Sequence, residues 1–252
     1  MVVYDSELKT SAEDTRVSAP EAKTATAHVT LAVVLQVRDE MLQVLLWQRA
    51  KEPCAGAWSL PGGDLGPEET LEQSIRRHLA QKVDVRELAH LEQLGTRSDP
   101  VRNPLRRELA TSYLGLVPRD LDPVVPADTA WHPVTRLPGL AFDHEPITMS
   151  GRERLRAKLS YTNIGFALAP ETFTISELRE LYVAALGYEV SATNLQRVLL
   201  RRGVLADTGG HRAPGAAGGR PASLFRFQSR TLEITDQFAV LRPPEPEPSE
   251  AA

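Results

Sequence analysis

The sequence predicts an α/β domain followed by a small module of two helices and a β-hairpin. Between residues 28 and 161, strand-like apolar runs alternate with segments of helical periodicity. From residue 162 to about residue 240 the order changes to helix, helix, hairpin. The chain as a whole is acidic, with a formal net charge of -4, but its second part is strongly basic. We therefore expect two domains, the second of which meets an anionic partner.

The composition is that of an ordinary soluble protein. The 252 residues suffice for one large domain or two modest ones. Cys54 is the only cysteine, which excludes an internal disulfide and a thiolate metal cluster. Apolar runs such as Leu31–Leu35 are too short to span a bilayer, and the start of the chain lacks the apolar core of an export signal. We expect a cytoplasmic protein without a membrane partner.

The first domain opens with a predicted hairpin. Residues 1–27 are polar without a lasting period and are expected to be flexible. The runs VTLAVVLQV and MLQVLLWQR, separated by a turn at Arg38–Glu40, predict two strands of a mixed sheet. A loop rich in Gly and Pro follows, PCAGAWSLPGG, and then a helix from about Glu68 to Lys82.

Further strands and one long helix complete this domain, which ends at residue 161. Strands are expected near Leu91–Thr96, Leu109–Val117 and Trp131–Val134. The segment Asp143–Tyr161 predicts a helix with Asp143 as its N-terminal cap.

The second domain, residues 162–240, has the outline of a winged helix-turn-helix. Thr174–Glu177 fits a capping box, and Gly187 ends the helix that follows it. Ser191–Arg202 predicts a second helix, which Gly203 ends. The runs GVLAD and SLFRF then bracket a glycine-rich loop and predict a hairpin. Residues 241–252 are expected to form a disordered tail.

The stretch from Gly62 to Val85 carries a motif. Gly63, Glu69 and Arg77 are followed by Leu79 and Val85, and LPGG leads into them. This spacing resembles the Nudix box, and the resemblance extends over roughly residues 28–161. It implies an α/β/α sandwich that binds a nucleoside-diphosphate-linked ligand beside the box helix.

The metal-binding part of the Nudix box is missing. In that pattern, glutamates at positions i, i+3 and i+4 of the helix share one face and hold Mg²⁺ under a pyrophosphate. Here those positions carry His78, Gln81 and Lys82, and Asp84 replaces the closing glycine. A lysine ammonium repels Mg²⁺. We therefore expect no bound metal, no catalytic residues, no cofactor and no hydrolase activity, but retained ligand binding.

The frame of the box supports retained binding. Arg77 either contacts the ligand or pairs with Glu69 to hold the loop. Arg49 resembles the family arginine that contacts phosphates, the alternative being a surface arginine. Trp47 and Trp58 either stack on an adenine or belong to the core. The predicted ligand-binding residues are Arg49, Trp58, Pro61, Gly62, Gly63, Glu69 and Arg77.

Charge and side-chain type in the second domain favour DNA binding. Seven arginines and one acid, Asp207, lie between Ser191 and Arg230. The second helix is expected to turn Leu195, Val198 and Leu199 toward the core. Arginine reads guanine and asparagine reads adenine in the major groove, while loop arginines suit phosphates. The predicted DNA-binding residues are Thr193, Asn194, Arg197, Arg201, Arg202, Arg212 and Arg220.

Both domains together resemble the Nudix-related transcriptional regulators of NAD metabolism, the NrtR family. Beside the box, the segments FTISELRELY, TNLQRVLLRRGVL and GGRPASLFRF carry this resemblance. It implies a homodimer joined through the Nudix domains, a palindromic double-stranded DNA operator near genes of NAD synthesis or salvage, and ADP-ribose or a related NAD metabolite as effector. A small rotation within Tyr161–Phe173, which joins the domains, would move both recognition helices off register.

The sequence is compatible with three classes of function. The favoured class is a ligand-responsive, DNA-binding repressor of NAD biosynthesis or salvage genes. The second is a Mg-dependent ADP-ribose pyrophosphatase with an accessory domain, which the missing carboxylates disfavour. The third is an adaptor that uses the winged module for protein contacts. Affinity for DNA through several arginines falls steeply with salt, which distinguishes the first class from the third.

Overall fold

The computed structural model describes residues 26–213 and 221–236. The predictions made for residues 1–25, for the middle of the glycine-rich loop with Arg220, and for the tail at 241–252 lie outside the described residues. In the part of the chain that is described, no helix is both long enough and apolar enough to cross a membrane.

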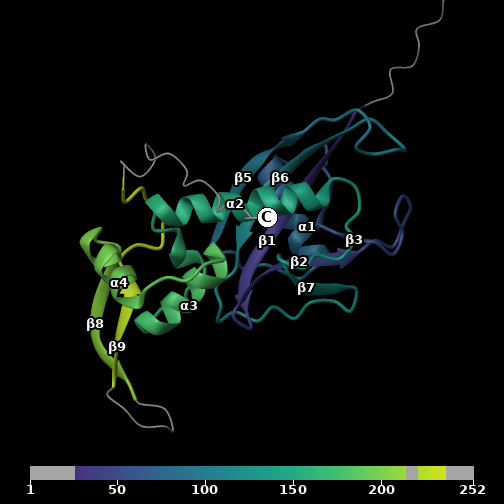
Figure 1. The fold of residues 1–252 in the computed structure, drawn as a ribbon. Coiled ribbons are helices and arrows are strands. Elements are labelled where there is room, and N and C mark those ends of the chain that lie inside the picture. The colour runs from purple at the N-terminus through teal and green to yellow at the C-terminus, as the bar shows by residue number, and fades with distance from the viewer. Residues whose placement is uncertain (1–25, 214–220, 237–252) are drawn as a thin grey trace, which may run out of the picture.

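The first domain is built on a mixed sheet (Figure 1). At its centre, β1 (Ala27–Arg38) runs antiparallel to β2 (Met41–Gln48) and parallel to β6 (Glu108–Leu116). The remaining strands pair with these three, and they are β3 (Trp58–Ser59), β4 (Gly62–Asp64), β5 (His90–Arg97) and β7 (Thr129–Pro133). The predicted hairpin is therefore confirmed, and the strands predicted near residues 91, 109 and 131 are present with slightly different ends.

The sequence suggested that the segment PCAGAWSLPGG is a loop, but parts of it form strands. Its residues in β3 pair with β2, and those in β4 pair with β1. Gly62 lies so close to β1 that an added Cβ would be 2.0 Å from the Thr30 carbonyl oxygen. Pairing of this kind depends on the neighbouring strand, so local composition rich in Gly and Pro does not predict it.

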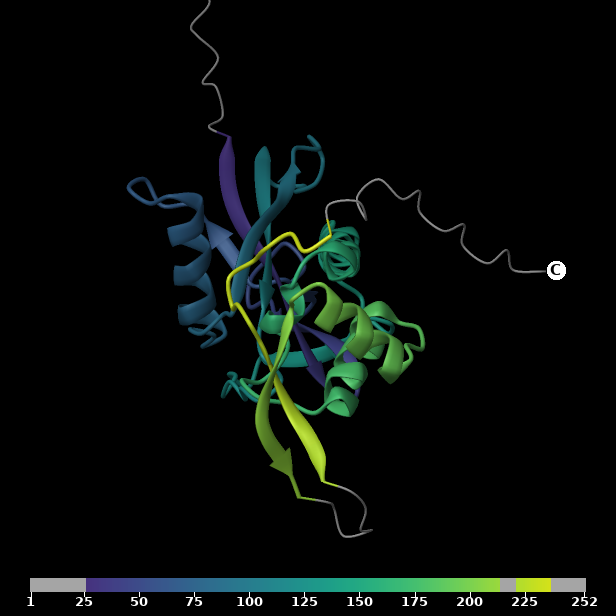
Figure 2. The same cartoon turned by 90° about the vertical axis from the view of Figure 1, so that its left-hand side faces the viewer.

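Helices cover both faces of the sheet (Figure 2). The side chains of β1 alternate between the faces, as a strand buried on both sides requires. Ala32 and Val34 pack with α1 (Leu71–Lys82), whereas Val33 and Leu35 belong to the core that includes α2 (His144–Tyr161). This arrangement is the predicted α/β/α sandwich.

The start of α1 and the capping of α2 differ from the prediction. α1 begins at Leu71 rather than near Glu68, because Thr70 and Gln73 form a capping box there. Asp143 stands at the N-cap position of α2, but its side chain caps no backbone N–H group. Its carboxylate instead accepts a hydrogen bond of 2.7 Å from Arg102.

The second domain has the predicted helix, helix, hairpin order. Its elements are η1 (Ile164–Ala167), α3 (Ile175–Leu186), α4 (Ala192–Arg201), β8 (Leu205–Arg212) and β9 (Ala222–Phe227). Thr174 and Glu177 form the predicted capping box at the start of α3. Gly187 ends this helix with φ +79°, a left-handed conformation that favours glycine.

One hydrophobic core runs through both domains. It joins β1 residues such as Leu35 to Phe166 and Phe173 and continues to Leu199 in α4. Phe173 is fully buried and forms a backbone bridge with Phe225 of β9. The segment Tyr161–Phe173 is therefore no exposed joint. A rotation confined to this segment, as the sequence suggested, is inconsistent with its burial, because packed neighbours on both sides must move with it.

Candidate functional site

A cavity of about 660 Å³ opens where the sheet meets the box loop. Its wall combines the start of β1, the loop after β2, the β3–β4 segment, the end of α1 and the loop that precedes β6. Of the predicted ligand-binding residues, Arg49, Gly62 and Gly63 line this cavity. Trp58, Pro61, Glu69 and Arg77 do not line it.

Glu69 and Arg77 hold the box loop. Arg77 Nε donates to Glu69 Oε2 at 2.8 Å, and Arg77 Nη2 donates to the Asp64 carbonyl oxygen at 3.2 Å. Glu69 also accepts a hydrogen bond of 2.6 Å from the Gly66 backbone N–H. The hydrogen bonds from Arg77, and then from Gly66, lower the pKa of Glu69 to about 2. The structural alternative considered for Arg77 is thus the one that this geometry supports.

In the Nudix box, one face of the helix carries the metal-binding glutamates. Here two side chains of that face contact backbone carbonyl oxygens of the box loop. His78 Nε2 lies 3.0 Å from the Asp64 carbonyl oxygen, and Lys82 Nζ donates to the Gly62 carbonyl oxygen at 2.6 Å. Gln81 is exposed. An added Cβ on Gly63 would be 2.6 Å from His78 Cε1, so the imidazole packs directly on the loop backbone. Burial lowers the pKa of His78, which keeps the ring neutral at pH 7.

These side chains do not fit Mg²⁺. The ion prefers carboxylate oxygens and water in octahedral geometry, whereas the face offers an imidazole, an amide and an ammonium. Within residues 26–213 and 221–236, no group of three His, Cys, Asp or Glu side chains is placed to hold a metal ion.

The two tryptophans beside the loop have different surroundings. Trp47 lines the cavity, and its Nε1 donates to the Leu60 carbonyl oxygen at 3.1 Å. Trp58 packs edge-on against His132, with ring centroids 4.4 Å apart, and its backbone bridges to Leu140. The prediction of Trp58 as a ligand-stacking residue therefore does not fit the structure, because its ring belongs to the core packing.

Sequence reasoning missed several residues of the cavity wall. Arg106 and Phe142 line it, and Arg49 lies over the Phe142 ring at 4.8 Å from the centroid. His144 begins α2 and is buried. Its Nδ1 accepts a hydrogen bond of 3.0 Å from the Leu60 backbone N–H, and burial lowers its pKa to about 3.

The second candidate surface lies on α4, at the end of the molecule away from β3 (Figure 1). Thr193, Asn194, Arg197 and Arg201 are all exposed on this helix. Arg197 Nη2 donates to Asn194 Oδ1 at 2.8 Å, so the two side chains present themselves together. The opposite side of the helix carries the buried Leu195 and Leu199 and the half-buried Val198.

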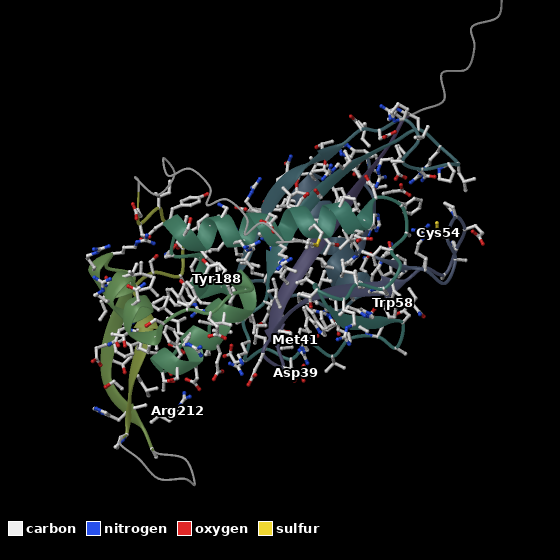
Figure 3. The ribbon with its side chains drawn as sticks, in the orientation of Figure 1. Asp39, Met41, Cys54, Trp58, Tyr188 and Arg212 are labelled. Carbon is white, nitrogen blue, oxygen red and sulfur yellow. The ribbon has the colours of Figure 1, made fainter. Side chains whose placement is uncertain are left out.

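Two predicted DNA-binding arginines have partners within the protein. The side chain of Arg202 is 14% exposed, and it donates to the Ser160 carbonyl oxygen at 2.8 Å and to Asp236 at 2.7 Å. It fastens α4 to the end of α2 and does not join the exposed face, which corrects the prediction. Arg212 lies on the wing, where it forms an ion pair with Glu177 at the start of α3 (Figure 3). Arg226 on β9 is exposed and adds to the charge of the wing.

Family comparisons divide the chain in the same way. Residues 27–150 match the NUDIX domain, and residues 165–227 match the NrtR DNA-binding winged helix domain. A similar curated protein is the ADPR responsive transcriptional repressor NtrR of Acinetobacter baylyi, 28% identical over 201 residues, which span 77% of this chain and 79% of the relative.

Solved structures agree with these matches. The crystal structure of Shewanella oneidensis NrtR complexed with a 27mer DNA is 33% identical, with a TM-score of 0.69, and the match covers 79% of this chain and 93% of that one. A MutT/nudix family protein from Enterococcus faecalis is 22% identical, with a TM-score of 0.67, over 82% of this chain and 90% of that one. The latter similarity shows the fold alone.

Proposed function

Since this chain belongs to the NrtR family, we propose that it is a DNA-binding transcriptional repressor whose Nudix-like domain binds ADP-ribose. The observation that carries this proposal is the exposed face of α4, where arginine and asparagine lie side by side without a carboxylate among them. The Acinetobacter baylyi relative is named as a transcriptional repressor, and the Shewanella oneidensis structure is a complex with DNA; both support the same function. We place the protein in the cytoplasm.

The α4 face suits the major groove of B-DNA. An arginine guanidinium bonds guanine N7 and O6, and an asparagine amide bonds adenine N6 and N7. The hydrogen bond from Arg197 to Asn194 fixes both side chains before DNA arrives. Arg226 on the exposed wing is placed to meet phosphates, which position the domain without reading the sequence.

We further propose a homodimer joined through the Nudix-like domain and a palindromic operator near genes of NAD biosynthesis or salvage. Winged and helix-turn-helix dimers read two half-sites about one helical turn, ~34 Å, apart. The distance between the two recognition helices then controls affinity, and a ligand acts by changing it.

Helix α2 is the element that connects ligand and DNA. It begins with His144 in the cavity wall and ends beside the second domain, where the Ser160 carbonyl oxygen accepts from Arg202 of the recognition helix. The Tyr161 carbonyl oxygen also accepts a hydrogen bond of 2.8 Å from the Thr235 backbone N–H. A ligand that shifts the start of α2 therefore shifts the end to which α4 is fastened.

We expect ADP-ribose to lower the affinity for operator DNA. A ligand changes DNA binding only if it binds the two arrangements with different affinity, and the effect is reciprocal. Calorimetric titration of ADP-ribose into the free protein and into the protein–operator complex measures both affinities. The operator should weaken ADP-ribose binding by the same factor as ADP-ribose weakens operator binding. Equal affinities in the two titrations would exclude ligand-driven release.

We also expect the purified protein not to hydrolyse ADP-ribose at enzyme-like rates with Mg²⁺ or Mn²⁺. The reason is that His78 and Lys82 occupy the face on which a hydrolase gathers its metal, and both are bonded to loop carbonyls. The test is to measure, by chromatography, whether AMP and ribose 5-phosphate are released from ADP-ribose. A turnover near ~1 per second, within the usual range for enzymes, would favour the pyrophosphatase alternative.

A further inference from the structure

Three cationic side chains that line the cavity form no ion pair among the described residues. Lys51 is exposed, whereas Arg49 and Lys82 are half-buried. Neighbouring arginines differ in this respect: Arg77 pairs with Glu69, and Arg106 pairs with Asp64 and Glu108. Unpaired cations that share a cavity repel each other, and an anionic ligand relieves that repulsion.

Lys82 is half-buried at the end of α1. Its Nζ donates to the Gly62 carbonyl oxygen at 2.6 Å and lies 4.5 Å from the centroid of the Trp47 ring. An ammonium has three N–H donors, so this one hydrogen bond leaves two for a ligand. Burial, and then the charge of Arg49, lower the pKa of Lys82, against the opposing effect of Asp64. The charges of Arg49 and Lys82 therefore act on each other across the cavity.

Arg49 directly follows β2 and is held by a hydrogen bond from its Nε. Its Nε donates to the Pro53 carbonyl oxygen at 2.8 Å, and its guanidinium lies over the Phe142 ring. No hydrogen bond to Nη1 or Nη2 occurs within the described part of the chain. The planar guanidinium, fixed at one edge, suits a phosphate oxygen pair.

We infer that Lys82 and Arg49 form a metal-independent binding site for a diphosphate, in which the Lys82 ammonium supplies the positive charge that Mg²⁺ supplies in a Nudix hydrolase. A diphosphate diester carries two negative charges, one for each cation. Trp47 and Phe142 supply aromatic surface beside it for the rest of the ligand. The identification of that ligand as ADP-ribose rests on the proposed function, whereas the diphosphate itself follows from the two cations.

The test is calorimetric titration of ADP-ribose and, separately, of inorganic pyrophosphate into the full-length protein. Each titration is performed with EDTA and again with Mg²⁺. The wild-type protein should bind both probes in EDTA, and Mg²⁺ should not tighten binding. Lys82→Met keeps the length of the side chain and its contact with Trp47 but removes the charge. It should weaken binding roughly 10- to 100-fold, as expected for a hydrogen bond to a charged group.

Two further variants separate charge from structure. Lys82→Arg should retain most of the affinity, because it keeps a cation at the same place. Arg76→Met, on the exposed side of the same helix, removes an equal charge outside the cavity and should leave affinity unchanged. Thermal unfolding of each variant shows whether the fold is intact.

The outcomes distinguish this inference from the proposed function. If ADP-ribose binds only with Mg²⁺, or if Lys82→Met binds as tightly as the wild type, the inference is overturned and the repressor function stands. If ADP-ribose does not bind but pyrophosphate binds in EDTA and depends on Lys82, the effector is wrong and the diphosphate site stands. If neither probe binds in EDTA, the inference is overturned.

Discussion

Replacing Arg102 with methionine should lower the free energy of unfolding by about 3–5 kcal/mol, the usual cost of removing one partner of a buried ion pair. The side chain of Arg102 is 2% exposed and donates to both Glu108 and Asp143. Glu108 is 6% exposed, so the substitution leaves a carboxylate that water solvates poorly and that keeps only Arg106 and Asn103 as side-chain partners. Asp143 is the N-cap residue of α2, where the positive end of the helix dipole offsets part of the lost interaction.

Denaturant unfolding at pH 7 measures this effect. Arg107→Met is the matched control, because among the described residues the Arg107 side chain donates only to the Ser98 carbonyl oxygen, in an exposed contact. It should change stability by about 0.5 kcal/mol or less. Adding Glu108→Gln to Arg102→Met removes the buried negative charge of Glu108 and should recover part of the lost stability. If Arg102→Met lowers the free energy of unfolding by less than about 1 kcal/mol, the buried ion pairs of Arg102 do not contribute substantially to stability.

The double variant Arg197→Ala/Arg201→Ala should lose operator affinity by roughly 100-fold or more. One good bidentate contact to a base is worth about 1–3 kcal/mol of discrimination, and every 1.4 kcal/mol is about tenfold. Both side chains are exposed on α4, and their removal leaves the buried face of the helix untouched. Fluorescence anisotropy with operator and shuffled DNA, at one fixed salt concentration, measures the loss of affinity and of preference.

A substitution of Arg202, the C-cap residue of α4, should affect stability and not base preference. Arg202→Gln breaks the contacts to Ser160 and Asp236, so it should lower thermal stability while base preference remains. Arg76→Ala on α1 controls for the loss of charge far from α4. Operator binding by the Arg197/Arg201 variant at wild-type affinity would show that another surface meets DNA.

Local signals predicted much of this fold. The two apolar runs around Arg38–Glu40 specify a hairpin by themselves, and the capping box at Thr174 fixes the start of α3. The short strands β3 and β4 could not be predicted, since they exist only because β1 and β2 are beside them. The ion pair of Asp143 could not be predicted either, because its partner Arg102 lies 41 residues away in the chain.

The candidate site was predictable in its frame and not in its details. The spacing of Gly63, Glu69 and Arg77 located the loop, and the charge of Lys82 is the reason to expect no metal there. Sequence alone does not state what Lys82 bonds instead, because the Gly62 carbonyl oxygen is brought to it by the fold. Likewise, the sequence does not distinguish the roles of Trp47 and Trp58. In the fold, Trp58 packs against His132, whereas Trp47 lines the cavity.

The core shared by the two domains has a thermodynamic consequence. Because Phe166, Phe173 and Leu199 belong to the same packed cluster as Leu35, we expect the two halves to unfold as one cooperative unit. A ligand that binds only the native state stabilises that whole unit, by an amount set by its concentration relative to its Kd. The winged half is thereby stabilised at the moment an effector occupies the cavity. We therefore expect derepression to be an exchange between two folded arrangements and not a local melting of the winged half.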